Sequence, residues 1–318
     1  MSALASPASL KGVLPARDAA SALGEGFRAA GAEAIELPIA DGGTGTAEVL
    51  MASLGGQWHE ASVSDPLGRR VRARWLLLPD GTAVVESAEA IGLARLQTGE
   101  LDPMRASSRG LGELIAAALD VGPGALLVCL GDSATVDGGA GVMEVLGGFP
   151  VPARAVCDVR NPLLGERGAA AVFGPQKGAT PEQVVELEAR LAAMGSLRPF
   201  ASLPGAGAAG GLGAAMAALG AELVQGAELV LELIGFRAQA RSSGLVVTGE
   251  GRVDRSTTEG KAPGVVLRIC REEGIRCAIF GGRVEEELQG AEVYELSGDP
   301  ARARVDLVAL GERLGAGR

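Results

Sequence analysis

Short apolar runs alternate with segments of helical periodicity along most of the chain. Thr46–Leu54, for example, repeats apolar residues at helical spacing, so that Ala47, Leu50 and Leu54 share one face. Alternation of this kind predicts βαβ units and a mainly parallel sheet. Strands are expected at Glu33–Ile39, Ala125–Leu130, Ala155–Val159, Leu245–Thr248, Cys277–Phe280 and Glu292–Leu296, and further helices at Ser107–Leu119, Thr180–Met194 (opened by a capping box) and Pro263–Glu273.

The region after the first of these helices breaks the alternation. Gln57–Val63 and Val71–Leu78 are joined by the turn Asp65–Arg69, which predicts a strand pair, and Ala83–Ser87 is expected to add a strand beside them. A hairpin between alternating ends suggests an inserted domain. We therefore predict an α/β fold with two α/β domains: a Rossmann-like parallel-sheet domain from residues 1–62 and 236–318, and a mixed-sheet domain from residues 63–235 inserted into it.

Several predicted strands end in glycine-rich turns that carry a carboxylate or a lysine. Glycine lets the backbone approach a ligand closely and point N–H groups at it. Carboxylates in such turns can hold Mg²⁺ or accept a proton. The pattern therefore favours an enzyme that handles phosphate. The turns are Ile39–Thr46 with Asp41, Gly131–Gly139 with Asp132, Ser133 and Asp137, Gly174–Gly178 with Lys177, Thr248–Asp254 with Glu250, and Glu259–Pro263 with Lys261.

Each of these turns also has a plain structural interpretation. Asp41 would act as a general base or orient Mg²⁺ through water, or it would cap the helix that follows. The hydroxyls and N–H groups around Asp132 suit a phosphate, whereas a capped helix start would need only one glycine. The stretch from Gly131 to Gly141 holds four glycines, which favours the phosphate interpretation.

Two other motifs allow more than one interpretation. Gly205, Gly207 and Gly210 match GxGxxG, but no strand precedes them, so a dinucleotide fingerprint is disfavoured. A backbone cradle for a ligand and close helix packing both stay open for this motif. Asp158–Gly165 follows a predicted strand with a carboxylate, a guanidinium and an amide, and its alternative is an Asx turn before proline.

Lysine is rare in this chain. Lys11, Lys177 and Lys261 are its only lysines among 29 basic residues, and each lies in a turn flanked by glycine or proline. The surface charge is supplied by arginine instead. A compact ammonium on a flexible stem suits contact with phosphate as a point charge.

Composition excludes several classes of function. The 318 residues carry a net charge of −10, which disfavours nucleic acid as a partner. His59 is the only histidine. The chain therefore has no multi-histidine metal site, and a Ser-His-Asp triad is strongly disfavoured. The Ala206–Ala221 run is shorter than the ~20 residues of a membrane span, and residues 1–9 do not have the pattern of a leader peptide. We expect a cytoplasmic protein with no membrane partner; the sequence allows a homodimer.

Five segments together resemble the bacterial type-1 glycerate kinases. The resemblance implies transfer of the γ-phosphoryl group of ATP to a hydroxyl of D-glycerate, with Mg²⁺, and favours the 2-position. It also implies two α/β domains, one inserted in the other, with the active site in the cleft between them. The segments are Gly131–Gly141, Cys157–Gly165, Ala169–Thr180, Pro204–Gly213 and Val247–Asp254, the last followed by Gly260–Pro263.

The beginning of the chain departs from that family. The family pattern is an apolar strand running into Pro-Asp-Ser-Phe-Lys-Gly, whereas Pro7–Gly12 has Ala8 in place of the aspartate. Only residues 1–6 precede it, so the strand is expected to be nearly absent and the first sheet incomplete. A start codon assigned too late would explain the short strand but not Ala8. The family also carries more residues where this chain has only Phe149–Ala155.

The turns and the resemblance together give the expected site. Asp41 is expected to be the carboxylate near the reacting hydroxyl, since Ala8 removes the other candidate. Lys11 and Asp158 complete the expected catalytic set. The expected phosphate and nucleotide contacts are Gly42, Gly43, Gly131, Asp132, Ser133, Lys177, Gly207 and Lys261; the substrate contacts are Ser9, Arg160 and Asn161; and the metal ligands are Asp137, Glu250 and Asp254.

Two rival functions follow from the same residues. Ala8 and the short first strand are also typical of a homologue that binds nucleotide or sugar acid without turnover. An α/β enzyme of different chemistry, such as a sugar-acid dehydratase, is the third interpretation.

Overall fold

The computed structural model describes residues 2–258, 260–286 and 288–317, and the chain divides into two compact units. Unit 1 comprises Met1–Asp41, Glu48–Ser53 and Gly226–Arg318, and unit 2 comprises Gly42–Ala47 and Leu54–Gln225. One sheet is parallel and the other is mixed, so the predicted α/β class is confirmed. The domain boundaries predicted from the sequence stay predictions.

Unit 1 is built on a parallel sheet with the strand order β11-β10-β9-β1-β2 within the described residues. The expectation of a nearly absent first strand is wrong, because β1 pairs with β2 on one side and with β9 on the other. Four residues suffice for a strand that is hydrogen-bonded along both edges. The strands are β1 (Ser2–Ala5), β2 (Glu33–Glu36), β9 (Leu245–Val253), β10 (Cys277–Val284) and β11 (Glu292–Glu295).

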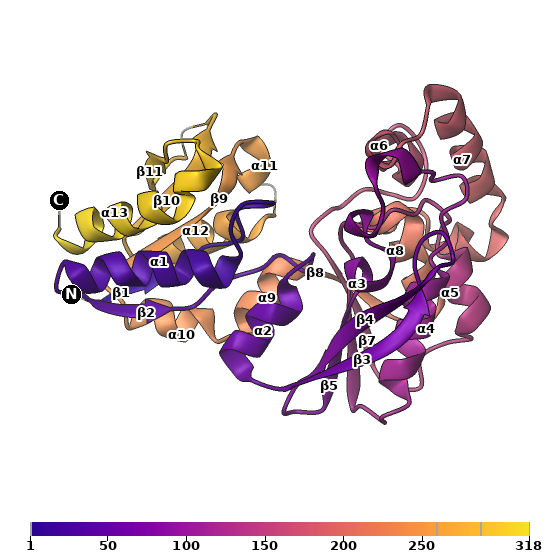
Figure 1. Cartoon of the computed structure of the whole chain (residues 1–318), viewed down its shortest axis with the longest axis horizontal. Helices are drawn as coiled ribbons and strands as arrows, with labels where there is room; N and C mark the ends of the chain where they lie inside the picture. The colour runs from indigo at the N-terminus through magenta and orange to yellow at the C-terminus, as the bar shows by residue number, and fades with distance from the viewer. Residues whose placement is uncertain (1, 259, 287, 318) are drawn as a thin grey trace. The chain divides into compact units, whose positions relative to one another are not determined.

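Helices cover both faces of this sheet. Ala3 and Ala5 of β1 join one core cluster with α1 (Ala16–Ala29) and α13 (Ala303–Gly315), which lie side by side (Figure 1). Leu4, between those two alanines, is fully buried but lies outside this cluster. Side chains alternate across a strand, so the second face is covered as well. There α12 (Ala262–Glu273) contacts β9 and β10.

Unit 2 is built on a mixed sheet with the strand order β3-β4-β5-β6-β7-β8. The predicted strand pair is confirmed, since β3 and β4 are antiparallel with Gln57 opposite Leu77. From β5 to β8 the strands are parallel, so their carboxyl ends share one edge of the sheet. The strands are β3 (Gln57–Ser64), β4 (Arg70–Leu77), β5 (Thr82–Glu86), β6 (Ala125–Cys129), β7 (Ala153–Cys157) and β8 (Glu222–Gln225).

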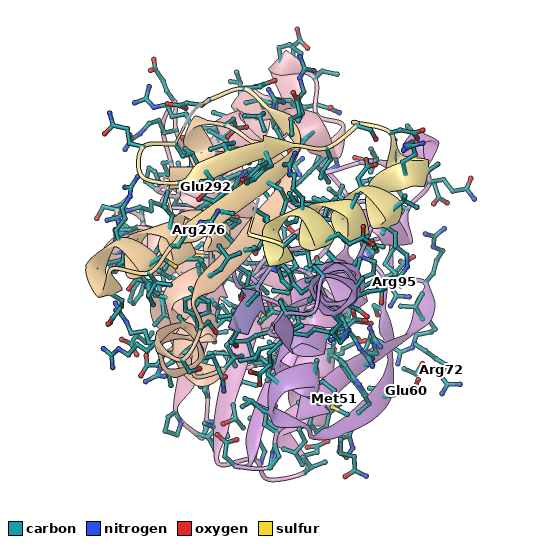
Figure 2. All side chains as sticks on the ribbon, turned by 90° about the vertical axis from the view of Figure 1, so that its left-hand side faces the viewer. Met51, Glu60, Arg72, Arg95, Arg276 and Glu292 are labelled. Carbon is teal, nitrogen blue, oxygen red and sulfur yellow. The ribbon has the colours of Figure 1, made fainter. Side chains whose placement is uncertain are left out.

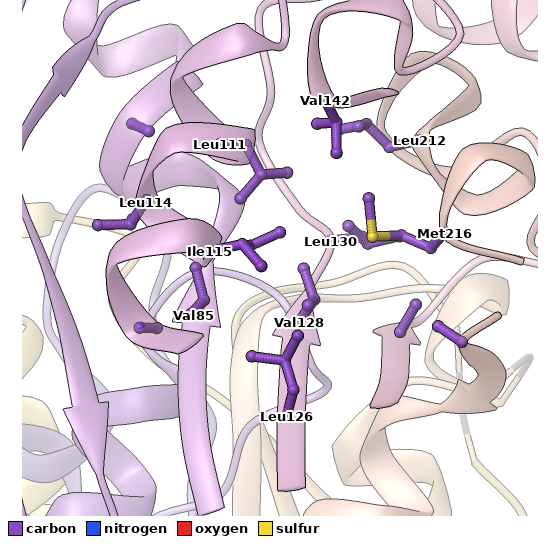
Figure 3. Close-up of a cluster of buried hydrophobic side chains, with 14 of the residues drawn as sticks. Val85, Leu111, Leu114, Ile115, Leu126, Val128, Leu130, Val142, Leu212 and Met216 are labelled. Carbon is purple, nitrogen blue, oxygen red and sulfur yellow. The ribbon is translucent and has the colours of Figure 1, made fainter. Parts of the chain in front are cut away.

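The largest core of unit 2 packs helices against this parallel part of the sheet. Figure 3 shows Val85 and Val128 of neighbouring strands facing Ile115 of α4 (Arg109–Leu119), and Leu130 lying beside Met216 of α8 (Ala208–Ala218). All five side chains are at most 2% exposed. Burying such a side chain contributes roughly 1.5–3 kcal/mol, so this layer fixes the strand ends from which the turns of unit 2 project.

The remaining helices are shorter or peripheral. The capping box predicted at Thr180 is confirmed: its side chain accepts from the Gln183 N–H, and its own N–H donates to Gln183 Oε1. No helix among the described residues has the length and apolar character needed to cross a membrane. These helices are α2 (Thr46–Leu54), α3 (Ser87–Ile91), α5 (Ala140–Val145), α6 (Ala169–Phe173), α7 (Pro181–Ala193), α9 (Gly226–Leu233), α10 (Phe236–Arg241) and α11 (Arg255–Thr258), with 3-10 turns at Leu93–Arg95, Thr98–Glu100, Pro175–Lys177, Gly195–Phe200 and Pro300–Arg302.

Arginine–carboxylate pairs tie neighbouring strands together at the surface. Arg276, just before β10, donates from Nε and Nη2 to the two carboxylate oxygens of Glu292 at 2.6 and 2.9 Å (Figure 2). Arg72 pairs with Glu60 across β3 and β4. Such exposed pairs contribute at most about 1 kcal/mol each, so the fold depends on its cores rather than on these pairs.

Candidate functional site

Three loops of unit 1 meet at the carboxyl ends of β1, β2 and β9. The Ile39 N–H donates to the Pro7 carbonyl at 3.0 Å, which joins the loops after β1 and β2. The Ala8 N–H donates to the Gly249 carbonyl at 2.9 Å, which joins the first loop to β9. Ligands of open α/β sheets bind at this edge. The loops bring predicted site residues into unit 1: Ser9, Lys11, Asp41, Glu250, Asp254 and Lys261.

Glu250 is a partly buried carboxyl group of this cluster with two side-chain partners. Lys261 Nζ lies 3.2 Å from its Oε2, and Thr257 Oγ1 donates to its Oε1 at 2.7 Å. Burial raises the pKa of Glu250, and the negative charge of Asp41 raises it further, against the two hydrogen bonds that lower it. Asp41 and Glu250 are therefore electrostatic neighbours, and a cation between phosphate and protein would stabilise both charged forms.

Asp254 lies in the same loop region but caps a helix. Its Oδ1 accepts from the Ser256 N–H at 2.8 Å and from the Ser256 hydroxyl, at the start of α11. The hydrogen bond from the Ser256 side chain holds the pKa of Asp254 below its ordinary value. Its Oδ1 thus serves the turn, while its Oδ2 lies 3.4 Å from Arg252 Nε; the expected metal ligation stays a prediction.

In unit 2, Glu86 anchors the Gly42–Ala47 loop. This buried carboxylate is the last residue of β5 and accepts from the Gly45 N–H at 3.1 Å and the Ala47 N–H at 2.7 Å. The sequence analysis did not select Glu86. A signal was available, because Glu86 is a carboxylate at the end of a predicted strand, as Asp41 and Asp158 are, but no glycine-rich turn follows it.

The loop that Glu86 anchors lies against the turn after β6. Thr44 Oγ1 donates to Asp132 Oδ2 at 2.8 Å. A Cβ added to Gly131 would lie only 2.8 Å from Gly43 Cα, so the two backbones touch where glycines occur in both. Asp132 has φ +50°, a conformation rare for a residue other than glycine. The predicted phosphate-binding residues Gly42, Gly43, Gly131, Asp132 and Ser133 are therefore brought together.

Lys177 reaches this turn from below the surface. It is 3% exposed, and its Nζ donates to Ser133 Oγ at 3.0 Å and to the Thr135 carbonyl at 2.7 Å. Burial lowers the pKa of Lys177 to about 7, although the charges of Asp137 and Asp132 raise it. The Lys177 side chain thus holds the Ser133–Thr135 segment, and the direct contact with phosphate expected from the sequence stays a prediction.

Asp137 hydrogen-bonds to the starts of two helices, α4 and α5, and so connects both to the same turn. Its carboxylate accepts from the N–H and the hydroxyl of Ser108, at 2.8 and 2.7 Å, and from the N–H groups of Gly139 and Gly141, at 3.1 and 3.2 Å. A carboxylate has about four acceptor positions, so four donors use its hydrogen-bonding capacity in full. These contacts give Asp137 a structural role in the turn, and its assignment as a metal ligand stays a prediction.

The GxGxxG motif serves close packing. The Gly207 N–H donates to the Asn161 carbonyl at 2.9 Å, and the Asn161 side chain donates to the Arg167 carbonyl at 2.8 Å. A Cβ on Gly207 would lie 2.2 Å from the Pro162 carbonyl oxygen. These contacts pack the motif against the loop after β7, and the expected nucleotide contact of Gly207 stays a prediction. Asn161 and Gly207 hold the loop after β7, from which Asp158 and Arg160 also project.

We expect Gly210→Ala to unfold unit 2 or lower its melting temperature by several degrees. Gly210 has φ +77°, and an added Cβ would lie 1.9 Å from the Thr135 carbonyl oxygen. Gly124→Ala is the matched control, because a Cβ there meets no atom within 4 Å and φ is not in the left-handed region. Thermal unfolding monitored by circular dichroism measures both. Equal melting temperatures for the two variants would contradict the packing role.

No group of three or more potential metal-ligating side chains (histidine, cysteine, aspartate or glutamate) occurs in the part of the chain that the structure describes. A carboxylate pair such as Asp41 and Glu250 still fits Mg²⁺, because this ion is commonly held by one or two carboxylates together with substrate phosphates. The donor chemistry therefore agrees with a metal that arrives with a nucleotide.

Comparison with known proteins gives the family. The model of the glycerate kinase family matches residues 3–151 and 150–299. "Glycerate 2-kinase" of Escherichia coli K12 is 38% identical, over 86% of this chain and 82% of the relative, and "Glycerate kinase" of Bacillus subtilis 168 is 37% identical, over 90% and 86%. A Salmonella typhimurium LT2 crystal structure proposed to be glycerate kinase 2 superposes with a TM-score of 0.85 at 33% identity, covering 100% of this chain and 98% of that one. The chain therefore belongs to the glycerate kinase family.

Proposed function

We propose that this chain transfers the γ-phosphoryl group of ATP to the 2-hydroxyl of D-glycerate, with Mg²⁺, as a type-1 glycerate kinase. The observation that carries the proposal is the cluster of Asp41, Glu250 and Lys261 at the carboxyl ends of the unit 1 strands, where burial raises the pKa of Glu250. Perturbed carboxyl groups of this kind are typical of functional sites. The name of the Escherichia coli relative supports the choice of the 2-hydroxyl.

The residues of unit 1 have different roles in the proposed phosphoryl transfer. Asp41 accepts the proton of the attacking hydroxyl, which needs a carboxylate within hydrogen-bond reach. Lys11 and Ser9, in the exposed loop after β1, contact phosphate or the carboxylate of glycerate. Glu250 would hold Mg²⁺ and Lys261 keeps Glu250 in place. When bound, Mg²⁺ neutralises charge on the phosphates.

In unit 2 the backbone of two touching turns receives phosphate. Gly42 and Gly43 supply N–H groups near the Asp132–Ser133 turn, in the manner of an anion-binding nest, and Gly131, whose N–H donates to Ser87 Oγ at 3.1 Å, lets the two backbones approach closely. Lys177 and Asp137 hold that turn through hydrogen bonds to its backbone. Asp158, in the loop after β7, is assigned to the substrate side of the reaction.

We assign the protein to the cytoplasm, acting on a small acid without nucleic acid or membrane partners. All four cysteines are free and buried, as is usual in a reducing compartment. The non-catalytic alternative keeps one observation in its favour, which is Ala8 where the family has aspartate.

We expect the purified protein to release ADP from Mg-ATP when D-glycerate is added. A coupled assay measures the rate, and phosphorus NMR of the product distinguishes 2- from 3-phosphoglycerate. Omission of glycerate is the blank. Nucleotide binding by calorimetry with no turnover above the blank would replace the kinase proposal by the non-catalytic one.

A further inference from the structure

Unit 2 contains a cavity of about 400 Å³ that none of the roles above uses. This volume is within the range of small-ligand pockets, roughly 300–1,000 Å³. Its wall combines apolar and polar groups in comparable measure. The lining includes Phe200, Leu203, Ala217 and Leu223, together with Arg160, Glu222 and Gln225.

The cavity runs along β8, the last strand in the order of the mixed sheet, from Glu222 at its start to Gln225 at its carboxyl end. A Cβ on Gly205 would lie 2.9 Å from Cys157 Sγ and 4.0 Å from Leu223 Cδ1, so the turn that includes Leu203 covers the end of β7 and contacts β8. Cys157, the last residue of β7, pairs with Gln225 of β8. Two motifs that sequence analysis selected for ligand contact, the Asp158–Gly165 loop and the Pro204–Gly210 loop, therefore meet at this cavity.

The lining discriminates between the two substrates of the proposed reaction. Glycerate is a small acid with two hydroxyls and has no surface that would gain from an apolar wall. A nucleotide base is flat and apolar on its faces and polar at its edges. Phe200 and Leu203 suit the faces, and the amide of Gln225, which both donates and accepts, suits an edge.

We propose that this cavity binds the adenosine part of ATP; the inference rests on the proposed kinase function. Arg160 moves from the glycerate contacts, where the sequence analysis placed it, to the nucleotide. Neighbouring strands lie about 4.8 Å apart, so β8 and β6 are roughly 10 Å apart. An extended nucleoside triphosphate spans that distance, which brings its phosphates toward the Asp132–Ser133 turn after β6.

The test substitutes Leu203, which is 39% exposed and so tolerates a charge without unfolding the core. Leu203→Asp should raise the KM for ATP at least tenfold and leave the KM for D-glycerate within twofold. Val185→Asp is the matched control, an equally apolar, 70% exposed residue on α7 that does not line the cavity. Arg160→Ala is the second variant, and calorimetric titration with ATP measures nucleotide binding without turnover.

The outcomes separate the two proposals. Turnover with an unchanged ATP affinity in both Leu203→Asp and Arg160→Ala would overturn the nucleotide cavity and leave the kinase function standing. If the wild-type protein binds ATP but never phosphorylates glycerate, and both variants lose ATP binding, the nucleotide cavity is supported and the kinase function is overturned. Wild-type protein that does not bind ATP would overturn both.

Discussion

Asp41→Asn is expected to lower kcat by roughly 10²- to 10⁴-fold, the usual cost of removing a general base. Asparagine keeps the size of the side chain and one oxygen, so the turn before α2 should survive and the melting temperature should change by no more than a few degrees. The charge of Asp41 also acts on Glu250, so the variant removes one of the two carboxylates available to Mg²⁺. Steady-state rates over a Mg²⁺ series, with thermal unfolding alongside, measure both effects.

Asp18→Asn provides the control for loss of one negative charge in unit 1. Asp18 is exposed in the first turn of α1 and belongs to no predicted site, so its substitution should leave kcat unchanged. If Asp41→Asn kept a near-normal kcat and melted at a clearly lower temperature, Asp41 would be a structural cap. The proton acceptor would then be sought at Asp158.

The fold could be predicted where hydrophobic periodicity and turn signals agreed. The helix Thr46–Leu54 has the predicted limits, and the β3–β4 pair follows from two half-buried runs joined by a turn. β1 could not be predicted in the same way, because Ser2–Ala5 is short and mostly alanine. Its stability comes from β2 and β9, whose paired residues lie 31 and more than 240 positions further along the chain.

The first and last helices show a different obstacle. α1 contains Gly24 and Gly26, and glycine is disfavoured inside helices by about 1 kcal/mol relative to alanine. In the structure, a Cβ on Gly26 would lie 2.1 Å from the Val308 carbonyl oxygen of α13. Local propensity argues against this helix, whereas its packing partner requires glycine there. The partner lies far along the chain and cannot be inferred from propensity.

The glycine-rich turns could be predicted only in part, and the roles of the residues within them could not. Glycine with a carboxylate marks strand ends at Ile39–Thr46 and Gly131–Gly139, but Thr248–Val253, predicted as a turn, continues β9, and Gly174–Gly178 follows helix α6. Whether a lysine faces solvent or the interior depends on what packs over it, and Lys177 is covered on all sides. Asp137 is similar, since its four donors include Ser108, which is 29 residues earlier in the chain.

Lys177→Met is expected to reduce kcat/KM about 100-fold, the cost of a misplacement of about 1 Å at a reacting group. Methionine fills the space but leaves the Ser133 hydroxyl and the Thr135 carbonyl without the donor they have in the wild-type protein. The Asp132–Ser133 turn would then lose its fixed position. The pH dependence of the free energy of unfolding, compared between this variant and the wild-type protein, tests whether the lysine is buried in solution.

The sign of that stability effect follows from the pKa of Lys177, which burial lowers from 10.5 to about 7. Between these values the unfolded chain binds a proton that the folded chain does not, so this residue makes the free energy of unfolding rise with pH. The contribution is present in full above the unfolded pKa and is lost as pH falls through about 7. Methionine does not titrate, so the variant should lack this rise. Urea unfolding of both proteins at several pH values across this window measures it, and parallel pH profiles would contradict a buried, titrating Lys177.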